Sequence, residues 1–573
     1  MRARRALRRR LPAAVLGLLA ACAAPPDLVF HGGRVLTLDH DPARGADPAD
    51  GRDPSAVAVR DGRVVAVGGE ELLESAGPDT RIVDLRGRVL MPAFADAHLH
   101  PFGLGAALSG LDLVGTRDFD AVLARVAARD ASLPSGRWLV GRGWDQNDWP
   151  DTAFPTRDRL DALVPDRPVL LVRVDGHAAL ANGAALRAAG VDAGTPDPEG
   201  GRILRDAAGE PTGLLVDAAV GLVRAAMPPP DEAELEERLR RAQDHLLARG
   251  VVAVHAAGLG AREIAVLRRW DAEGRLRLRV HVMLDGDDDE LLAHWFARGP
   301  ELDHLGRGHL AVRAVKLYAD GALGSRGAWL LDDYADDPGN RGLVLTPPER
   351  IREVAVRCRE AGFQVCTHAI GDAANRAVLD AYAAAGVRAA DRFRIEHAQV
   401  VAEPDFRRFA ELGVLPSMQA QHEVSDAPWA EDRLGPDRAR GAYAWRRFLD
   451  LGVPVPGGSD APVERVDPFA AWWAACARQD LQLRPPGGWH SELAMSRDEA
   501  LLHLTVWPAH AAFREADLGR IAPGYRADFV VVAGGDPRRV APEGVRELRV
   551  LETWVDGELV SAPDLGSAAR PPR

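Results

Sequence analysis

The sequence predicts an α/β protein with a (β/α)8 barrel, the TIM-barrel arrangement, at its centre. Eight short segments rich in apolar or β-branched residues recur between positions 89 and 458, and several of them end on a histidine, a lysine or an aspartate. Such barrels place reactive side chains at the C-terminal ends of their strands. The composition, 47% hydrophobic and 27% charged, is that of a globular protein and argues against disorder and repeat arrays.

The barrel strands are expected in order along the chain. The first follows the apolar run 89–94 and leads to His98 and His100. Period-two alternation and β-branched content predict seven more strands. These lie at 251–255, 277–283, 312–318, 363–368, 393–397, 414–418 and 453–458.

A large insertion is expected after the first strand. Residues 94–510 comprise 417 positions, whereas a barrel of this type needs about 250. The 143 positions of 103–245 hold Trp144 and Trp149, turns rich in proline and glycine, and a strand of their own at 168–174. Without them 274 positions remain, which fits one barrel.

The first 21 residues are typical of a bacterial export signal. Arginines crowd positions 2–10, and the apolar run 11–21 is too short to span a bilayer. The run ends at Cys22 in the pattern Leu-Ala-Ala-Cys, which resembles a lipobox. We therefore expect an exported protein held on the membrane by a lipid at Cys22, the alternative being a plain secretory signal with a chance cysteine. The other cysteines are expected to be buried free thiols: Cys358, Cys366 and Cys476.

The rest of the chain is strongly acidic. Residues 1–21 hold six arginines and no acidic residue, so the formal net charge of −13 becomes −19 without them. Such a surface repels phosphate backbones, and no nucleic-acid partner is expected. No later apolar stretch approaches the roughly 20 residues of a membrane span, so membrane contact is expected only through the anchor. A homodimer is left open.

Lysine occurs once, at Lys316, among 71 basic residues. Arginine stays protonated, whereas a buried lysine can lose its proton and then capture carbon dioxide as a carbamate, a carboxylate on a long arm. The segment 312–318 alternates and is β-branched, which predicts a strand that places Lys316 near its C-terminal end. A glycine-rich loop with Gly321, Gly324 and Gly327 follows. Chance retention of one lysine is the alternative.

Five further side chains suit a metal centre at the same rim. His98 and His100 are two apart, so in a strand both imidazoles point to one face. His368, His397 and Asp460 each end a predicted strand. One such residue alone is more often a capping or core residue than a ligand. Together with Lys316 they predict a cation site.

Long motifs give the chain a family resemblance. They are ADAHLH (95–100), GRGWDQNDW (141–149), DGHAALAN (175–182), VKLYADGALGSRGA (315–328), THAIGDAAN (367–375), RIEHAQV (394–400) and GGSDAPVE (457–464). With them the chain resembles the amidohydrolase superfamily, in the amidohydrolase-3 branch that includes N-substituted formamide deformylases. The resemblance covers nearly all of the chain after the signal.

The resemblance implies a distorted (β/α)8 barrel, 93–510, with a metal centre at its C-terminal mouth. It also implies that 22–92 and 511–562 pack together as a small β-sandwich, while 563–573 is a tail. It assigns one or two divalent metals, with zinc expected, and a carbamate on Lys316 that bridges them. The implied metal ligands are His98, His100, Lys316, His368, His397 and Asp460.

The expected activity is hydrolysis of a non-peptide C–N bond in a linear amide or an N-acyl or N-formyl compound. A metal lowers the pKa of water toward about 7 and generates hydroxide, and Asp460 is expected to act as general acid and base. His177 is expected to act in catalysis by bonding the substrate carbonyl. Expected substrate contacts are His422, Asp426, Trp144 and Trp429.

Three alternatives stay open. The same centre could open a cyclic amide such as a hydantoin or a lactam. A lipid-anchored binding protein could use the barrel without turnover, although a full ligand set argues against it. A purely structural zinc is disfavoured, because the ligands come from distant strands without a cysteine cluster.

Overall fold

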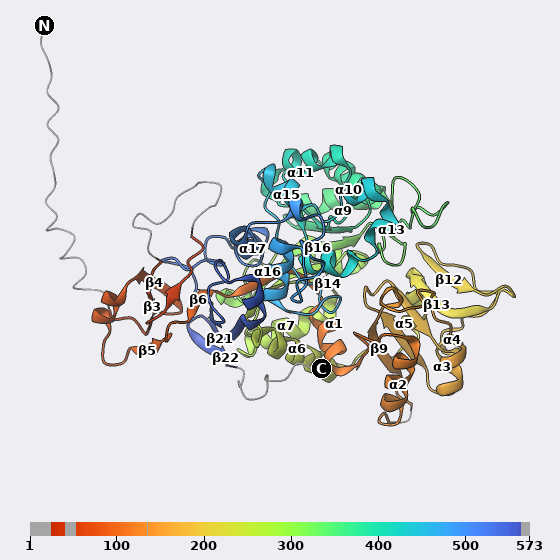
Figure 1. Ribbon diagram of the computed structural model, residues 1–573, viewed down its shortest axis with the longest axis horizontal. Coiled ribbons are helices and arrows are strands. Elements are labelled where there is room, and N and C mark those ends of the chain that lie inside the picture. The colour runs from red at the N-terminus through yellow and green to blue at the C-terminus, as the bar shows by residue number, and fades with distance from the viewer. Residues whose placement is uncertain (1–23, 40–52, 135, 563–573) are drawn as a thin grey trace, which may run out of the picture.

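A seven-stranded parallel sheet forms the barrel in the computed structural model, which describes residues 24–39, 53–134 and 136–562. The strand order is β19-β18-β17-β16-β15-β14-β7, so each strand lies beside the barrel strands that precede and follow it along the chain. The predicted α/β barrel is therefore present, and its strands lie at the centre of the molecule (Figure 1). The strands are β7 Phe94–Leu99, β14 Val251–Leu259, β15 Arg279–Asp285, β16 Leu310–Tyr318, β17 Gln364–Ala369, β18 Arg394–His397 and β19 Leu415–Ser417.

The eighth predicted strand, 453–458, is an extended segment and not a regular strand. Pro454 and Pro456 lack the backbone N–H that a ladder needs. The segment still joins β19 to β7: Met418 N–H donates to the Pro456 carbonyl at 3.0 Å, and Ala97 N–H donates to the Gly457 carbonyl at 2.8 Å. It therefore occupies the eighth position of the barrel and leads directly to Asp460.

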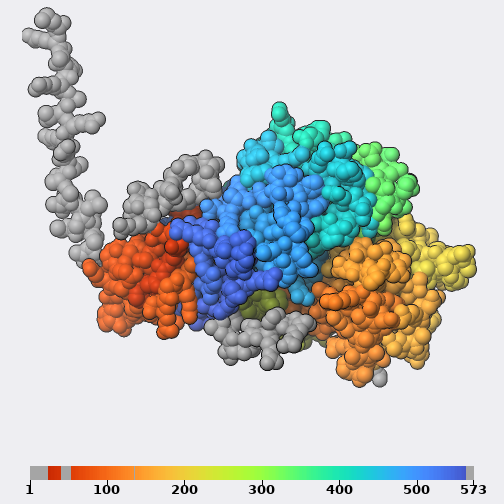
Figure 2. Space-filling model, viewed as in Figure 1, coloured from red at the N-terminus to blue at the C-terminus, as the bar shows by residue number. Residues whose placement is uncertain are grey.

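Strands from both ends of the chain share one sheet. The five-stranded sheet β2-β6-β20-β21-β22 combines β2 Arg34–Val35 and β6 Val89–Pro92 with the C-terminal strands β20 Phe529–Ala533, β21 Arg549–Val555 and β22 Glu558–Ser561. In Figure 2 the dark blue C-terminal residues lie between the red N-terminal segment and the barrel.

A second, four-stranded sheet packs on that shared sheet. Its order is β4-β3-β1-β5, with β1 Leu28–His31, β3 Ala56–Arg60, β4 Arg63–Gly68 and β5 Arg81–Asp84. Phe30 of β1 contacts Phe529 and Trp554 edge-on, with ring centroids 5.6 and 5.0 Å apart. The two sheets thus enclose a common apolar core.

The chain between β7 and β14 builds a separate six-stranded sheet, ordered β12-β13-β11-β10-β9-β8. It lies on the side of the barrel opposite the terminal strands (Figure 1). The strands are β8 Leu111–Asp112, β9 Leu139–Trp144, β10 Val169–Arg173, β11 Ala178–Ala181, β12 Gly201–Arg205 and β13 Pro211–Asp217. Its helices are α2 Phe119–Asp130, α3 Asp158–Leu163, α4 Gly183–Ala189 and α5 Ala218–Ala225.

Two helices, α1 Pro101–Ser109 and α6 Glu232–Leu247, flank this unit and pack on each other beside the barrel. The insertion predicted from the sequence, 103–245, includes most of both. Helix α6 packs on β14 as well as on α1. The approach is close: a Cβ on Gly105 would lie 1.9 Å from the Arg238 carbonyl oxygen. The six-stranded sheet and its own helices therefore lie between α1 and α6 along the chain.

The remaining helices alternate with the barrel strands or cover the rim. They are α7 Ala261–Ala272, α8 Asp289–Arg298, α9 Pro348–Ala361, α10 Asp372–Ala384, α11 Phe406–Leu412, α12 Ala420–Asp426, α13 Ala430–Leu434, α14 Pro436–Ala439, α15 Trp445–Asp450, α16 Pro468–Ala477, α17 Arg497–His503 and α18 Val506–Ala511.

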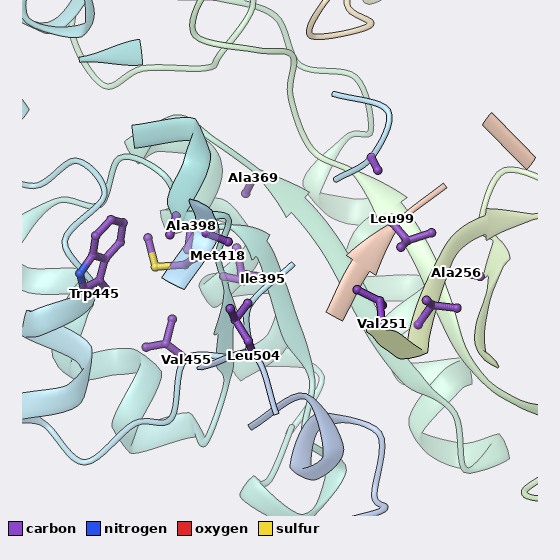
Figure 3. Packing of buried hydrophobic residues seen from close by; sticks show 14 of the residues in the cluster. Leu99, Val251, Ala256, Ala369, Ile395, Ala398, Met418, Trp445, Val455 and Leu504 are labelled. Carbon is purple, nitrogen blue, oxygen red and sulfur yellow. The ribbon is translucent and has the colours of Figure 1, made fainter. Parts of the chain in front are cut away.

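Apolar side chains from strands and helices fill the space between them, and Figure 3 shows part of this cluster around Ile395 and Met418. Cys358 and Cys366 are buried free thiols, as predicted, and Cys476 is a half-buried one. Among the described residues, no helix has both the length and the apolar character to cross a bilayer. The predicted signal (1–21), Cys22 and the tail (563–573) lie outside the described residues.

Candidate metal centre

Three acceptor atoms converge at the C-terminal rim of the barrel. His98 lies in β7, His100 directly follows this strand, and Asp460 follows the extended segment 453–458. Their ligand atoms all lie within 4.8 Å of one another. Asp460 Oδ1 is 3.3 Å from His100 Nε2 and 3.6 Å from His98 Nε2.

The protons of both imidazoles point away from this meeting point. His98 Nδ1–H donates to Glu396, and His100 Nδ1–H donates to the Ala257 carbonyl at 3.1 Å. In neutral imidazoles both Nε2 atoms then carry lone pairs, and Asp460 Oδ1 is left buried without a hydrogen bond. Three acceptors that face one another repel unless a cation lies between them, so this donor set fits a metal ion.

His98 is held by a buried ion pair beneath the rim. Glu396, which accepts from His98, also accepts from Arg394 Nη2 at 2.8 Å, and both side chains are fully buried. Arg394 also donates to Ser417 Oγ at 2.9 Å and to His255 Nδ1 at 2.7 Å. Burial raises the pKa of Glu396, but the charge of Arg394 and the bond to His98 outweigh it and hold this pKa far below the usual range. The carboxylate therefore stays charged and fixes the tautomer of His98.

Lys316 reaches the same point from β16. Its side chain is 1% exposed, and Nζ lies 3.4 Å from His98 Nε2. Burial is the main cause that lowers the pKa of Lys316 to about 8. A neutral amine is thus accessible near neutral pH.

His368 and His397 extend the cluster along the rim. They lie at the C-terminal ends of β17 and β18, with ring centroids 4.5 Å apart, and His397 lies 5.0 Å from His98. Burial lowers the pKa of both well below the usual value, which favours the neutral form that binds metals. His397 Nδ1–H donates to Gln419 Oε1 at 2.7 Å, which leaves Nε2 free. His368 Nε2 is buried without a hydrogen bond, 3.5 Å from Asp320 Oδ1.

A cavity of about 780 Å³ opens above these residues. His368, His397 and Asp460 line it from the barrel, and His177 lines it from the inserted sheet. The ring centroids of His177 and His368 are 5.3 Å apart. The cavity is therefore shared by the two units, and a ligand in it would touch both.

Three of the four predicted substrate-contact residues line this cavity: His422, Asp426 and Trp429. Burial raises the pKa of Asp426 to about 8, and its carboxylate accepts from Tyr443 at 2.5 Å and from Gln399 at 2.7 Å.

Trp144, the fourth, does not reach the cavity. It is 1% exposed, packs in the core of the inserted unit, and its indole N–H donates to the Leu171 carbonyl at 2.7 Å. The prediction that Trp144 contacts the substrate is therefore wrong, and this side chain packs in the core of the inserted unit.

The sequence analysis did not predict several side chains that orient the histidines of this site. Glu396 and Arg394 share one face of β18 by alternation, and this pattern could have revealed them. Asp320 accepts backbone N–H groups from Trp329, Ile370 and Gly371 and had no comparable signal. The remaining two, Asp217 and Gln419, bond His177 and His397.

Known proteins are similar to this chain over most of its length. The model of the Amidohydrolase family matches residues 81–561. An N-substituted formamide deformylase of Arthrobacter pascens is 32% identical over 562 residues, covering 93% of this chain and 98% of the relative. The protein LONG AFTER FAR-RED 3 of Arabidopsis thaliana is 33% identical over 519 residues, covering 88% of each chain.

A solved structure is similar over most of the chain. It is that of an uncharacterized metal-dependent hydrolase of Pyrococcus horikoshii, with a TM-score of 0.71 and 28% identity. The match covers 90% of this chain and 99% of the other.

Proposed function

The chain belongs to the amidohydrolase family, as the resemblance predicted, and we propose that it is a metal-dependent hydrolase of a non-peptide C–N bond. One observation carries this proposal most strongly. His98 Nε2, His100 Nε2 and Asp460 Oδ1 converge at the rim with their lone pairs toward one another, beneath a cavity large enough for a small organic substrate.

His98, His100, His368, His397 and Asp460 would hold one or two divalent ions, and the donor set suits zinc. Lys316, 3.4 Å from His98, would join them as a carbamate, because a carboxylate on this arm supplies an anion where an ammonium would repel the cations. When bound, the metal supplies Lewis acidity and lowers the pKa of water.

The side chains around the reacting centre then move protons and orient the substrate. Asp460, which lies beside these ligands at the rim, would accept a proton from water and return it to the leaving nitrogen. An amide needs this step because an amine anion is a poor leaving group. Burial lowers the pKa of His177, but the bond to Asp217 outweighs it and raises this pKa overall. The protonated ring would then donate from Nε2 to the substrate carbonyl across the cavity.

The substrate class we propose is a linear amide, or an N-acyl or N-formyl compound. The Arthrobacter relative is named for deformylating N-substituted formamides, and it aligns over 98% of its length. His422, Asp426 and Trp429 would contact the nitrogen substituent.

The test combines metal analysis with a substrate panel. Purified protein is expected to contain zinc, to lose activity with a chelator and to regain it with zinc. Linear N-substituted formamides and acetamides are assayed beside hydantoins and lactams. Faster turnover of the cyclic series would reassign the substrate class, and binding of amides without turnover by zinc-loaded protein would contradict an enzyme. A high-resolution crystal structure would reveal a carbamate as density beyond Lys316 Nζ.

We also propose that residues 1–21 direct export and that Cys22 carries a lipid, so that the enzyme works on the outer side of a bacterial membrane. The arginine-rich start and the Leu-Ala-Ala-Cys sequence support this. Mass spectrometry of the mature N-terminus tests it. An acylated Cys22 is expected, and a mature chain that begins at any other residue would contradict it.

A further inference from the structure

We infer that Asp217 is a positioning residue that aims His177 of the inserted unit at the reacting centre on the barrel. The inference rests on the proposed role of His177. It adds the residue that holds the imidazole ring in the orientation which this role requires. His177 lies in the turn between β10 and β11, and Asp217 is the last residue of β13. Both belong to the inserted sheet.

Asp217 bonds His177 twice. The His177 Nδ1–H donates to Asp217 Oδ1 at 2.6 Å, and the Asp217 backbone N–H donates to the His177 carbonyl at 2.7 Å. The carboxylate is fully buried, whereas the imidazole is 19% exposed and lines the cavity. Since Nδ1 is occupied by Asp217, Nε2 is the nitrogen left for a ligand.

The barrel loop that follows Lys316 encloses the same carboxylate. A Cβ on Gly321 would lie 2.8 Å from both carboxylate oxygens of Asp217, and a Cβ on Gly327 would lie 2.6 Å from Oδ2. Neither glycine has a positive φ, so close approach to Asp217 is what requires them. The glycines of this loop therefore seat a carboxylate that belongs to the other unit.

The backbone at Asp217 is strained, with φ 49° and ψ −121°. Glycine adopts this conformation readily, whereas aspartate is disfavoured in it. An aspartate in a conformation that suits glycine is expected where its side chain has a function. Here the side chain bonds His177 through Oδ1.

The experiment compares Asp217→Asn, Asp217→Gly and Gly321→Ala with the wild type. Asp206→Asn, an exposed turn residue of the same sheet, is the matched control. The kcat for a linear amide is expected to fall about 100- to 1,000-fold in the three test variants with KM changed less than about threefold. Asp217→Gly is expected to melt at or above the wild-type temperature, because it relieves strain. A merely structural Asp217 would instead lower this temperature.

Two further readouts separate the inference from the proposed function. The clash of Gly321→Ala is with the Asp217 carboxylate, so the double variant with Asp217→Gly is expected to match Asp217→Gly alone. Crystal structures of Asp217→Gly and Asp217→Asn are expected to have the His177 ring turned away. If the wild type hydrolyses no amide, the proposed function fails and these crystal structures alone decide. A ring that keeps its orientation in both variants, or wild-type kcat in both, would overturn the inference.

Discussion

The substitution Glu396→Gln tests how the rim is held. It keeps the shape of the side chain but leaves the charge of Arg394 buried without its partner. Removing one partner of a buried ion pair costs about 3–5 kcal/mol. An unfolding entropy of about 2.1 cal/mol/K per residue over 573 residues converts this to a melting temperature about 3–4 °C lower.

The same variant is expected to weaken metal binding. Glu396 accepts from His98 Nδ1 and so keeps Nε2 free for a cation, and loss of such a partner costs about 10- to 100-fold in affinity. Melting of metal-free protein and zinc competition with a chromophoric chelator measure the two effects separately.

Glu515→Gln is the matched control. Glu515 also bonds an arginine with both oxygens, Arg392 at 2.5 and 2.9 Å, but it is 40% exposed and remote from the rim. Water screens that pair, so a loss of about 0–1 kcal/mol and unchanged zinc affinity are expected. The reasoning would be refuted if Glu396→Gln melted like Glu515→Gln and bound zinc like the wild type.

Three further predictions concern the cavity and its rim. Asp460→Asn is expected to keep metal and lose activity about 100- to 10,000-fold, and zinc content with kcat measures both; wild-type turnover would exclude Asp460 as the proton carrier. Lys316→Arg is expected to lose metal or activity in the same assays, and an unaffected enzyme would remove the carbamate. The pKa of Asp426 is raised to about 8 by burial, so its ionisation destabilises the fold as pH rises from about 4 toward 8. Asp426→Asn is therefore expected to gain melting temperature relative to wild type over that range, and a constant difference in melting scans would contradict this.

The barrel could be predicted because several of its strands are short apolar runs that end at or near a histidine or a lysine. His368 and His397 each close a short apolar run, and the structure has them at the ends of β17 and β18. The periodicity of 453–458 could not show that this segment would occupy the eighth barrel position without forming the hydrogen bonds of a regular strand. The prolines there block strand hydrogen bonds while the apolar pattern persists.

Tertiary partners were harder to predict, because sequence separation hides them. Asp217 lies 40 positions from His177 and outside every quoted motif, although it bonds that imidazole. Trp144 failed in the opposite way: it lies within a motif near the cavity, yet its large apolar surface is used in the core of the insertion. A motif thus marks a region of interest without telling which side chain faces the substrate.

The single lysine is where sequence and geometry combine most tightly. All the other basic residues counted in the sequence are arginine. The lysine at position 316 therefore indicates a need for a property that a guanidinium lacks. Its Nζ lies 3.4 Å from His98 Nε2, beside the point where lone pairs converge. Two unit charges 4 Å apart at an effective dielectric of 20 repel by about 4 kcal/mol, and a divalent ion doubles this. A permanent cation here would expel the metal, whereas an amine that can shed its proton, and take up carbon dioxide, would bind it.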